Sequence, residues 1–384
     1  MITRDDALAL DEADPLSSRR GEFLIADQSL IYLDGCSLGR MPRRTVERID
    51  HLLRDEWADG LVRSWDHWID LPQGVGDRLA PLIGARDGEV VVHDSTTVNL
   101  YQLVDAACAL RPDRKVVAIG ADDFPTDRYV VDGIAAARGL QVRSDFDRLD
   151  DVAVIVRSVV DYRTAEVADV AGETARAAEA GAIALWDLSH AVGVLAIDLA
   201  AAGVKLAVGC TYKYLNGGPG SPAFSFVASD LQPMLPQPIW GWFAQADQFD
   251  MGSEFVPQPD IRRVLLGTPS ILALAAADEG IALTVESGID KVQAKVQALT
   301  GLALEVCDQF GLGSCTPRDP NRRGGHVAVQ HPRAGQLVAD LADAKVITDF
   351  REPDIVRIGC SPLTTRFIDV FDGLTRLHAL VSEG

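Results

Sequence analysis

Basic side chains are scarce in this chain of 384 residues: 36 Lys and Arg stand against 56 Asp and Glu, for a formal net charge of −20. A surface of this sign repels nucleic acid, and no run of Lys or Arg reverses the sign locally. We therefore expect no nucleic-acid partner. A small anionic substrate remains compatible, because a few arginines in a cleft outweigh a diffuse acidic background.

Long hydrophobic runs and regularly spaced cysteines are missing too. Residues 1–14 are polar and acidic, without the apolar core of a signal peptide, and the low-charge stretch 265–277 is too short to span a membrane. The six cysteines form no Cys-x-x-Cys pair, and the seven histidines show no ligand spacing. Neither a glycine-rich dinucleotide fingerprint nor a Walker lysine is present. We expect a reduced, cytoplasmic protein with no membrane segment and no metal site.

What the chain does have is 47% hydrophobic residues, arranged as short apolar runs that alternate with alanine-rich helical stretches. This alternation predicts βαβ units around a mostly parallel sheet, which is an α/β fold. The apolar runs are residues 90–92, 116–119, 152–156, 182–186, 199–202 and 206–208. The helical stretches between them are residues 97–109, 128–138 and 170–180.

The pattern changes after residue 239. Residues 240–259 are aromatic and irregular, and residues 268–310 read as long helices broken near Gly288 and Leu299. Strands then return at residues 326–330, 346–349 and 355–358. We predict a large α/β domain at residues 46–265, a small C-terminal α+β domain at residues 266–384, and an N-terminal segment, residues 1–45, that packs on the small domain.

The segment of residues 210–220 holds one lysine between two tyrosines, after an apolar strand and before a glycine-rich run. Burial disfavours the ammonium form of a lysine, and a neutral amine is what attacks an aldehyde to form a Schiff base. Glycines let the backbone approach a flat ligand closely. Lys213 is therefore our candidate for the lysine of a pyridoxal-phosphate site.

Three further groups complete such a site, which needs a carboxylate at the pyridine nitrogen, a phosphate cradle and a flat side chain over the ring. Asp187 follows an apolar strand, Phe124 supplies an aromatic face, and Ser95, Thr96 and Thr97 open a helix, whose N-terminus favours a phosphate. Each has a simpler explanation: helix caps for the serine, threonines and aspartate, core packing for Phe124, and a salt bridge for Lys213. Their order and spacing together favour the cofactor.

Eleven segments, spread over nearly the whole chain, resemble kynureninase. They are residues 32–39 (YLDGCSLG), 94–101, 124–127 (FPTD), 161–164 (DYRT), 186–190 (WDLSH), 210–220, 241–243 (GWF), 267–269 (GTP), 323–326 (RGGH), 349–353 (DFREP) and 356–359 (VRIG). The resemblance implies a pyridoxal-phosphate enzyme of fold type I, with a large domain built on a seven-stranded type of sheet. It also implies a homodimer with shared active sites.

The resemblance further implies hydrolysis of L-kynurenine, or a ring-substituted relative, to an anthranilate and L-alanine, as in tryptophan catabolism, NAD biosynthesis or secondary metabolism. Residue roles follow by matching motifs. Lys213, Tyr212 and Asp187 are implied as catalytic. Ser95, Thr96, Thr97, Phe124, Asp127, Asp187, His190, Tyr212, Lys213, Trp242 and Thr268 are implied to bind the cofactor, the last two from the neighbouring subunit. Ser37, Trp68, His190 and Arg357 are implied to bind the substrate, although Trp68 is equally typical of a core.

Three positions depart from the family pattern: Cys36 replaces an asparagine, Gln245 a histidine and Thr364 a tyrosine. These departures concern the choice of kynurenine and leave the reaction type intact. Two other hypotheses stay open. A cysteine desulfurase of the same fold would need a mobile cysteine, for which Cys315 is available, and a non-catalytic pyridoxal-phosphate protein would not need both Lys213 and Arg357.

Overall fold

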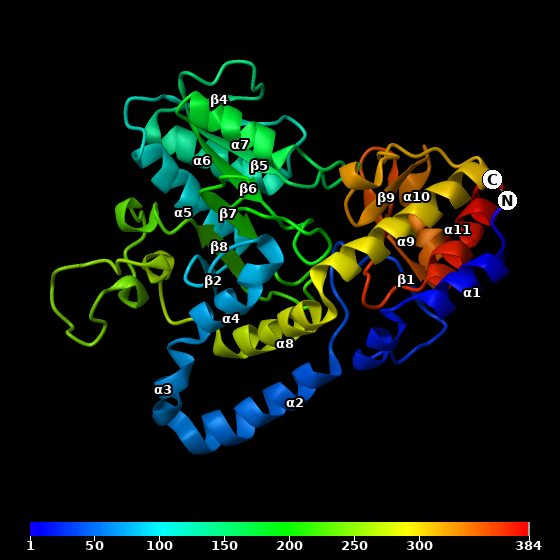
Figure 1. Cartoon of the computed structure of the whole chain (residues 1–384), viewed down its shortest axis with the longest axis horizontal. Coiled ribbons are helices and arrows are strands. Elements are labelled where there is room, and N and C mark those ends of the chain that lie inside the picture. Colours follow the sequence, from blue (N-terminus) through cyan, green and yellow to red (C-terminus); the bar gives the residue numbers. More distant parts are fainter. Residues whose placement is uncertain (383–384) are drawn as a thin grey trace.

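A seven-stranded sheet forms the centre of the larger lobe in a computed structural model that describes residues 1–382 (Figure 1). Its strand order is β2-β8-β7-β6-β5-β3-β4, and only β8 runs against its neighbours. The strands are β2 (Val90–His93), β3 (Val116–Ile119), β4 (Gln141–Arg143), β5 (Val152–Ser158), β6 (Ile183–Asp187), β7 (Leu206–Gly209) and β8 (Ala223–Val227). The predicted α/β class with a mostly parallel sheet is confirmed.

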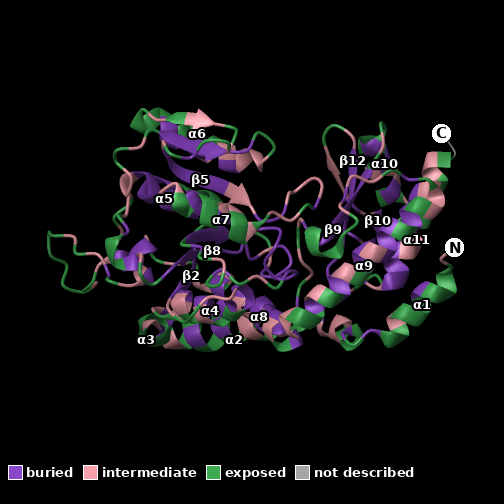
Figure 2. Cartoon of the chain, turned by 45° about the horizontal axis from the view of Figure 1, so that its top comes forward, coloured by how far each residue is buried: buried purple, intermediate pink, exposed green. Residues whose placement is uncertain are grey.

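Both faces of this sheet are covered, which explains why its inner strands are almost continuously apolar. Alternate residues enter two different cores: Val91, Val154 and Leu185 point to one, and Val92 and Ile155 to the other. Helices pack over the sheet in Figure 1, and Figure 2 shows the strands buried beneath them. The helices of this lobe are α2 (Arg43–His51), α3 (Trp65–Trp68), α4 (Leu71–Leu79), α5 (Thr96–Ala109), α6 (Pro125–Arg138), α7 (Val170–Glu179) and α8 (Ile271–Ser287).

The smaller lobe carries a three-stranded antiparallel sheet in the order β11-β12-β9 and a two-stranded parallel sheet of β1 and β10. The strands are β1 (Ile31–Tyr32), β9 (His326–Gln330), β10 (Val346–Ile347), β11 (Asp349–Arg351) and β12 (Ile355–Gly359). The helices are α1 (Arg4–Ala13), α9 (Ile289–Phe310), α10 (Ala334–Asp343) and α11 (Phe367–Ser382). Both termini lie in this lobe (Figure 1).

The N-terminal segment joins the two lobes. Its helix α1 packs on α11, and its strand β1 pairs with β10 in the smaller lobe. Gly39 then reaches the larger lobe, where its N–H donates to the Tyr212 carbonyl at 2.8 Å. A Cβ atom at Gly39 would overlap the Lys213 carbonyl, so only glycine permits this approach.

The domain boundaries predicted from sequence remain a proposal. Helix α8 packs on α2 and α4 of the larger lobe, whereas α9 packs on α11 of the smaller one. Gly288, with a φ of 79°, separates the two helices. This packing favours a boundary at Gly288 over one at residue 265.

Two local expectations are wrong, and two strands were not expected. Helix α9 runs unbroken through Leu299, because its buried face continues along Val296, Leu299 and Ala303. Residues 199–202 form a turn instead of a strand. Strands β4 and β8 were not predicted, the first because it is short and polar. Among residues 1–382, no helix combines the length and apolar character needed to cross a membrane.

A buried ion pair holds the N-terminal segment to α9, and its loss should destabilise the protein. Lys295 Nζ lies 2.6 Å from Asp14 Oδ2, with both side chains at most 5% exposed. Replacing Asp14 by alanine leaves a buried ammonium without its partner, so we expect the free energy of unfolding to fall by about 3–5 kcal/mol. Urea denaturation measures the change. Glu12→Ala, an exposed neighbour, is the control, and equal stability of the two variants would contradict the prediction.

Candidate active site

Lys213 lies in the loop that follows β7, at the carboxyl edge of the large sheet, and its side chain is buried. The loop is held by hydrogen bonds from Asn216 N to the Lys213 carbonyl (3.0 Å) and from Gly217 N to the Thr211 carbonyl (2.9 Å). Asn216 adopts a left-handed conformation, with φ of 57°. Helix α8 approaches closely through Gly280, where a Cβ atom would overlap the Leu215 carbonyl. The lysine is thus fixed by backbone contacts on several sides.

His190 connects Lys213 to Arg357 of the smaller lobe. Its Nε2 lies 3.2 Å from Lys213 Nζ and 3.5 Å from Arg357 Nη1. Burial, with the nearby charges of Lys213 and Arg357, holds the pKa of His190 well below its usual range. A neutral imidazole therefore lies between the two side chains, and both approach its Nε2.

Arg357, on β12, is completely buried and uses every donor that it has. Nε donates to Asp349 Oδ1 at 2.8 Å, Nη1 to the Tyr162 carbonyl at 2.8 Å, and Nη2 to Ser37 Oγ at 2.9 Å. Nη2 also bonds Asp349 Oδ2 and Nη1 contacts His190. These five contacts match the five N–H groups of a guanidinium. The arginine therefore joins β11, the N-terminal segment and the large lobe.

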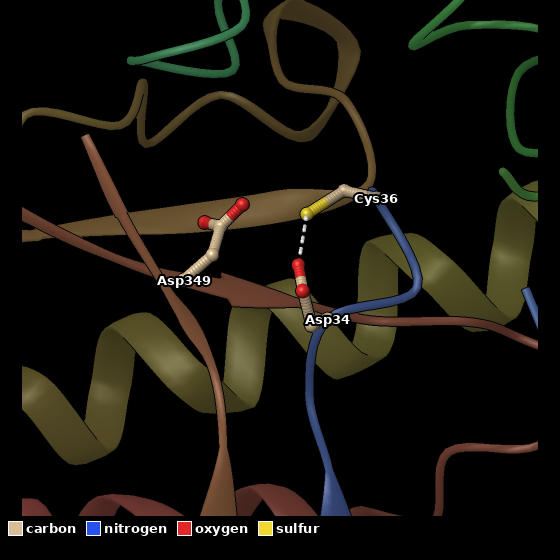
Figure 3. Close-up of side chains that lie close together, drawn as sticks. All are labelled: Asp34, Cys36 and Asp349. Carbon is tan, nitrogen blue, oxygen red and sulfur yellow. Dashed lines mark hydrogen bonds between the residues drawn. The ribbon is translucent and has the colours of Figure 1, made fainter. Parts of the chain in front are cut away.

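Asp349 belongs to a small cluster with Asp34 and Cys36, shown in Figure 3. Ser37 Oγ donates to Asp349 Oδ2 at 2.7 Å, and Arg351 Nη2 lies 2.7 Å from the same oxygen. Burial, together with the charge of Asp349, raises the pKa of Asp34 to about 6. Burial also raises the pKa of Cys36 to about 12, so this thiol, 3.6 Å from Asp34 Oδ1, keeps its proton.

Two buried carboxyl groups lie close enough to Lys213 for their charges to interact with it. Asp187 ends β6 and accepts a hydrogen bond from Ser189 N at 2.8 Å. Asp127 lies in the first turn of α6, and its Oδ2 has no hydrogen-bond partner among the described residues. Burial raises the pKa of both carboxyls, and the charge of Asp187 raises that of Asp127 further. Asp127 Oδ2 is therefore a buried acceptor without a donor, and a ligand that supplies an N–H or cationic donor beside this pair would be stabilised here.

Phe124 and the start of α5 complete this edge of the sheet. Lys213 Nζ lies 5.8 Å from the centre of the Phe124 ring, which packs edge-on against Tyr162. Ser95 caps α5 through Val98 N, and Ser95 and Thr97 are exposed while Thr96 is half-buried. The first N–H groups of this helix thus face an accessible surface, as a phosphate site requires.

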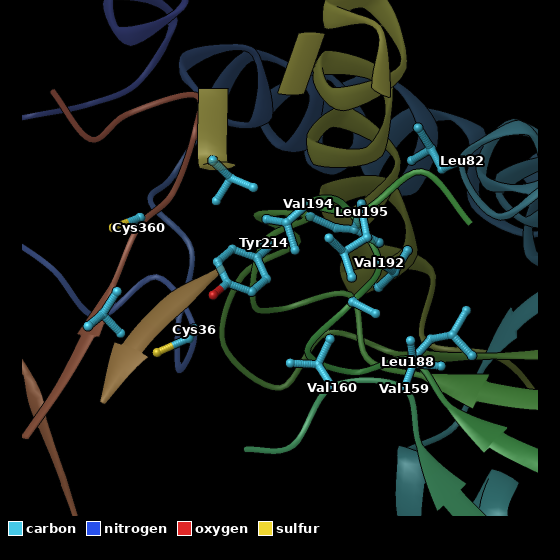
Figure 4. Close-up of a cluster of buried hydrophobic side chains, with 14 of the residues drawn as sticks. Cys36, Leu82, Val159, Val160, Leu188, Val192, Val194, Leu195, Tyr214 and Cys360 are labelled. Atoms are coloured by element: carbon cyan, nitrogen blue, oxygen red, sulfur yellow. The ribbon is translucent and has the colours of Figure 1, made fainter. Parts of the chain in front are cut away.

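The Tyr212 and Tyr214 rings flank Lys213 in sequence but have different environments. The Tyr212 ring centre lies 5.8 Å from Lys213 Nζ, and burial raises the pKa of its hydroxyl. Tyr214 is buried among apolar residues, and its hydroxyl is turned toward the side where Cys36 lies (Figure 4). Tyr212 is therefore the tyrosine whose ring lies near the Lys213 amine, and its hydroxyl keeps its proton.

Three predicted site residues lie elsewhere in this chain. Trp68 is buried with Leu52 and Ala275 and donates to Glu56 Oε2 at 2.6 Å, which matches its interpretation as a core residue. Trp242, 41% exposed, and Thr268, also exposed, lie on the surface of this chain.

The three departures from the family pattern are also located. Cys36 is buried beside the Arg357 network, and Thr364 is buried with its carbonyl bound by Arg20. Gln245 accepts from Val256 N at 2.7 Å, within the aromatic segment of residues 240–259.

Sequence reasoning missed two members of the site. Asp349 binds Arg357, and His326, on β9, lies with its ring centre 6.2 Å from that of His190. Neither His326 ring nitrogen has a hydrogen-bond partner within residues 1–382. Both residues lie in segments that resemble kynureninase. Only the pairing of β9, β11 and β12 shows that they face the large lobe.

Solved structures share this fold. The apo structure of a cysteine desulfurase from Thermococcus onnurineus NA1 matches with a TM-score of 0.81 at 17% identity, covering 92% of this chain and 95% of that one. The cystine C-S lyase C-DES, in complex with cysteine persulfide, matches with a TM-score of 0.80 at 15% identity, covering 91% and 98%. The fold is that of the type I pyridoxal-phosphate enzymes.

Sequence relatives define the family. The kynureninase of Pseudomonas fluorescens is 40% identical over 100% of this chain and 96% of its own length, and that of Burkholderia pseudomallei (strain 1106a) is 40% identical over 99% and 96%. The model of the kynureninase C-terminal domain matches residues 292–377. The chain belongs to the kynureninase family.

The buried His326 should make the protein sensitive to acid. Burial, and then the charge of Arg357, holds the pKa of His326 well below its usual range, so the folded state keeps it neutral. The unfolded chain takes up a proton below about pH 6.5, and stability is therefore lost as the pH falls. Between pH 7.5 and 5.5, we expect the wild type to lose about 1.4 kcal/mol more than His326→Gln does. Urea denaturation at both pH values measures this difference, and equal losses would contradict the prediction.

Proposed function

We propose that this chain is a pyridoxal-phosphate-dependent hydrolase that cleaves L-kynurenine, or a ring-substituted kynurenine, to an anthranilate and L-alanine. The observation that carries the proposal is the continuous contact from Lys213 through His190 to Arg357, in a chain that is 40% identical to kynureninases over its full length. The guanidinium can bind the α-carboxylate of an amino acid, and the lysine amine beside it is the group that holds an aldehyde cofactor.

The residues at this edge of the sheet fit pyridoxal phosphate. Asp187 and Asp127 are buried carboxyls with raised pKa values, and a protonated pyridine nitrogen would supply the cationic partner that keeps Asp187 ionised. The accessible start of α5, with Ser95, Thr96 and Thr97, would hold the phosphate. Phe124 would cover the ring, and Lys213 would hold the aldehyde carbon.

The chain's own residues divide the remaining work. When bound, the cofactor supplies an electron sink for the bonds broken next to the substrate's amino group. Arg357 binds the α-carboxylate, and Lys213 Nζ accepts the α-proton as general base. Tyr212, whose raised pKa keeps its hydroxyl protonated, donates a proton to the carbon freed when the side chain leaves. Ser37 and His190 orient the aryl ketone.

The desulfurase alternative has weaker support. Its nucleophile would be Cys315, but burial raises the pKa of this thiol, which disfavours the thiolate that attacks sulfur. The likeness to the desulfurase structure at 17% identity, and to the C-S lyase structure at 15% identity, concerns the fold. A non-catalytic binder would have no use for the buried lysine and arginine together.

We further propose a cytoplasmic homodimer. All six cysteines are free, as in a reducing compartment. Trp240, Trp242 and Phe249 are exposed on one irregular segment, which a second copy of the chain would cover. In this arrangement Trp242 and Thr268 complete the neighbour's phosphate site.

Turnover of L-kynurenine tests the function directly. Purified protein with pyridoxal phosphate should release a fluorescent anthranilate from L-kynurenine or 3-hydroxykynurenine, and no sulfide from L-cysteine. Lys213→Ala should lower kcat by about 10²–10⁴-fold or more, because it removes the general base. Lys205→Ala, an exposed lysine paired with Asp230 just before β7, should retain full activity. Sulfide release, or no product from any kynurenine, would contradict the proposal.

The role of Trp242 across the dimer predicts a selective loss of cofactor. Trp242→Ala should weaken pyridoxal-phosphate binding by about tenfold or more, because a buried tryptophan contributes more than 1 kcal/mol at an interface. Equilibrium dialysis measures the dissociation constant. Trp57→Ala is the control, since Trp57 is 55% exposed and lies outside the aromatic segment of residues 240–259. Unchanged cofactor binding in a Trp242→Ala dimer would exclude this role.

A further inference from the structure

Arg357 offers no unused donor to a substrate, so a carboxylate that binds it must replace an existing partner. Asp349 holds Nε and Nη2, while Ser37 holds the second Nη2 proton and Tyr162 and His190 share Nη1. The partner that the substrate displaces determines which edge of the Arg357 guanidinium binds the substrate carboxylate.

We propose that Asp349 is a positioning residue, which fixes Arg357 through its Nε–Nη2 edge and so presents the Nη1–Nη2 edge to the substrate carboxylate. The carboxylate displaces the two neutral side-chain partners, Ser37 and His190. This inference rests on the proposed function, in which Arg357 binds the α-carboxylate of an amino acid.

The strengths of the contacts decide which partners remain. The Asp349 contact is bidentate and joins two charges, and hydrogen bonds of this kind are roughly twice as strong as neutral ones. The His190 contact, at 3.5 Å, is the longest of the five, and the imidazole is neutral. Ser37 contributes a single neutral hydroxyl.

The surroundings of Asp349 also hold it in place. Arg351 Nη2 lies 2.7 Å from its Oδ2, and β11 pairs Asp349 directly with Arg357 of β12. Since the Arg357 side chain is fully buried, losing Asp349 would leave a buried guanidinium without its counter-ion. The arginine would then turn toward other acceptors and lose the orientation that the substrate needs.

The opposite role is physically possible and makes the proposal testable. An aspartate that merely competes with the substrate for Arg357 would, on removal, allow carboxylates to bind more tightly. A positioning aspartate, on removal, makes carboxylates bind more weakly and leaves amines unaffected. The two roles predict changes of opposite sign.

A pair of matched ligands separates these outcomes. L-Homophenylalanine resembles kynurenine but has no ketone to hydrolyse, and 3-phenylpropylamine is the same molecule without its carboxylate. Their dissociation constants for the holoenzyme are measured by isothermal titration calorimetry. We expect Asp349→Asn to raise the dissociation constant of L-homophenylalanine on the order of 30-fold. The dissociation constant of 3-phenylpropylamine should rise less than about threefold. Asp354→Asn, in the same hairpin and 4.0 Å from Arg163, is the charge-matched control and should change neither.

Each other result overturns the proposal. Tighter binding of L-homophenylalanine would make Asp349 a competitor, and equal weakening of both ligands would make its role structural. Should Asp349→Asn fail to fold, Asp349→Glu keeps the charge but lengthens the side chain by one methylene. This variant should bind L-homophenylalanine more weakly and 3-phenylpropylamine unchanged. Wild-type affinity for L-homophenylalanine would contradict the positioning role of Asp349.

The same ligands distinguish a failure of the proposed function from a failure of the role proposed for Asp349. A wild-type enzyme that prefers L-homophenylalanine over 3-phenylpropylamine yet hydrolyses no kynurenine would keep the role of Asp349 and reject the reaction. A wild type that binds both ligands equally would remove Arg357 as the carboxylate site, and the proposal with it.

Discussion

The hydrogen bonds that neutralise and satisfy the buried guanidinium of Arg357 hold the two lobes together at the site. Arg357 is completely buried, and its five donors reach Asp349 on the adjacent strand, Ser37 in the N-terminal segment, and Tyr162 and His190 in the large lobe. A buried guanidinium is tolerated only when every donor is satisfied and an anion is present. Arg357 can therefore be buried near Lys213 only if β11, the N-terminal segment and the large lobe all pack around it.

Charges at the site are arranged in two groups on either side of His190. Lys213 lies near the buried carboxyls of Asp187 and Asp127, and Arg357 lies near Asp349 and Asp34. The neutral imidazole of His190 lies between Lys213 and Arg357 and contacts both. The proposed function uses this separation: Arg357 binds the α-carboxylate of an amino acid, and Lys213 accepts the proton from its α-carbon.

Local patterns predicted the fold well and the site only in part. Short apolar runs predicted β2, β3, β5, β6 and β7 because buried parallel strands are apolar on both faces. The break expected at Leu299 did not occur, because tertiary packing of α9 overrides the weak local signal. Lys213 and Asp187 followed from their positions after strands. Asp349 and His326 did not, since the Ser37–Asp349 contact joins residues 312 positions apart and no local spacing encodes it.

The central claim is that Lys213 is the residue that holds the cofactor. Reduction of the purified holoenzyme with sodium borohydride, followed by mass spectrometry of its peptides, measures this directly, because reduction fixes the cofactor to the lysine that carries it. The account predicts a pyridoxyl group on the peptide that contains Lys213. A pyridoxyl group on another lysine, or on none in a protein saturated with pyridoxal phosphate, would contradict it.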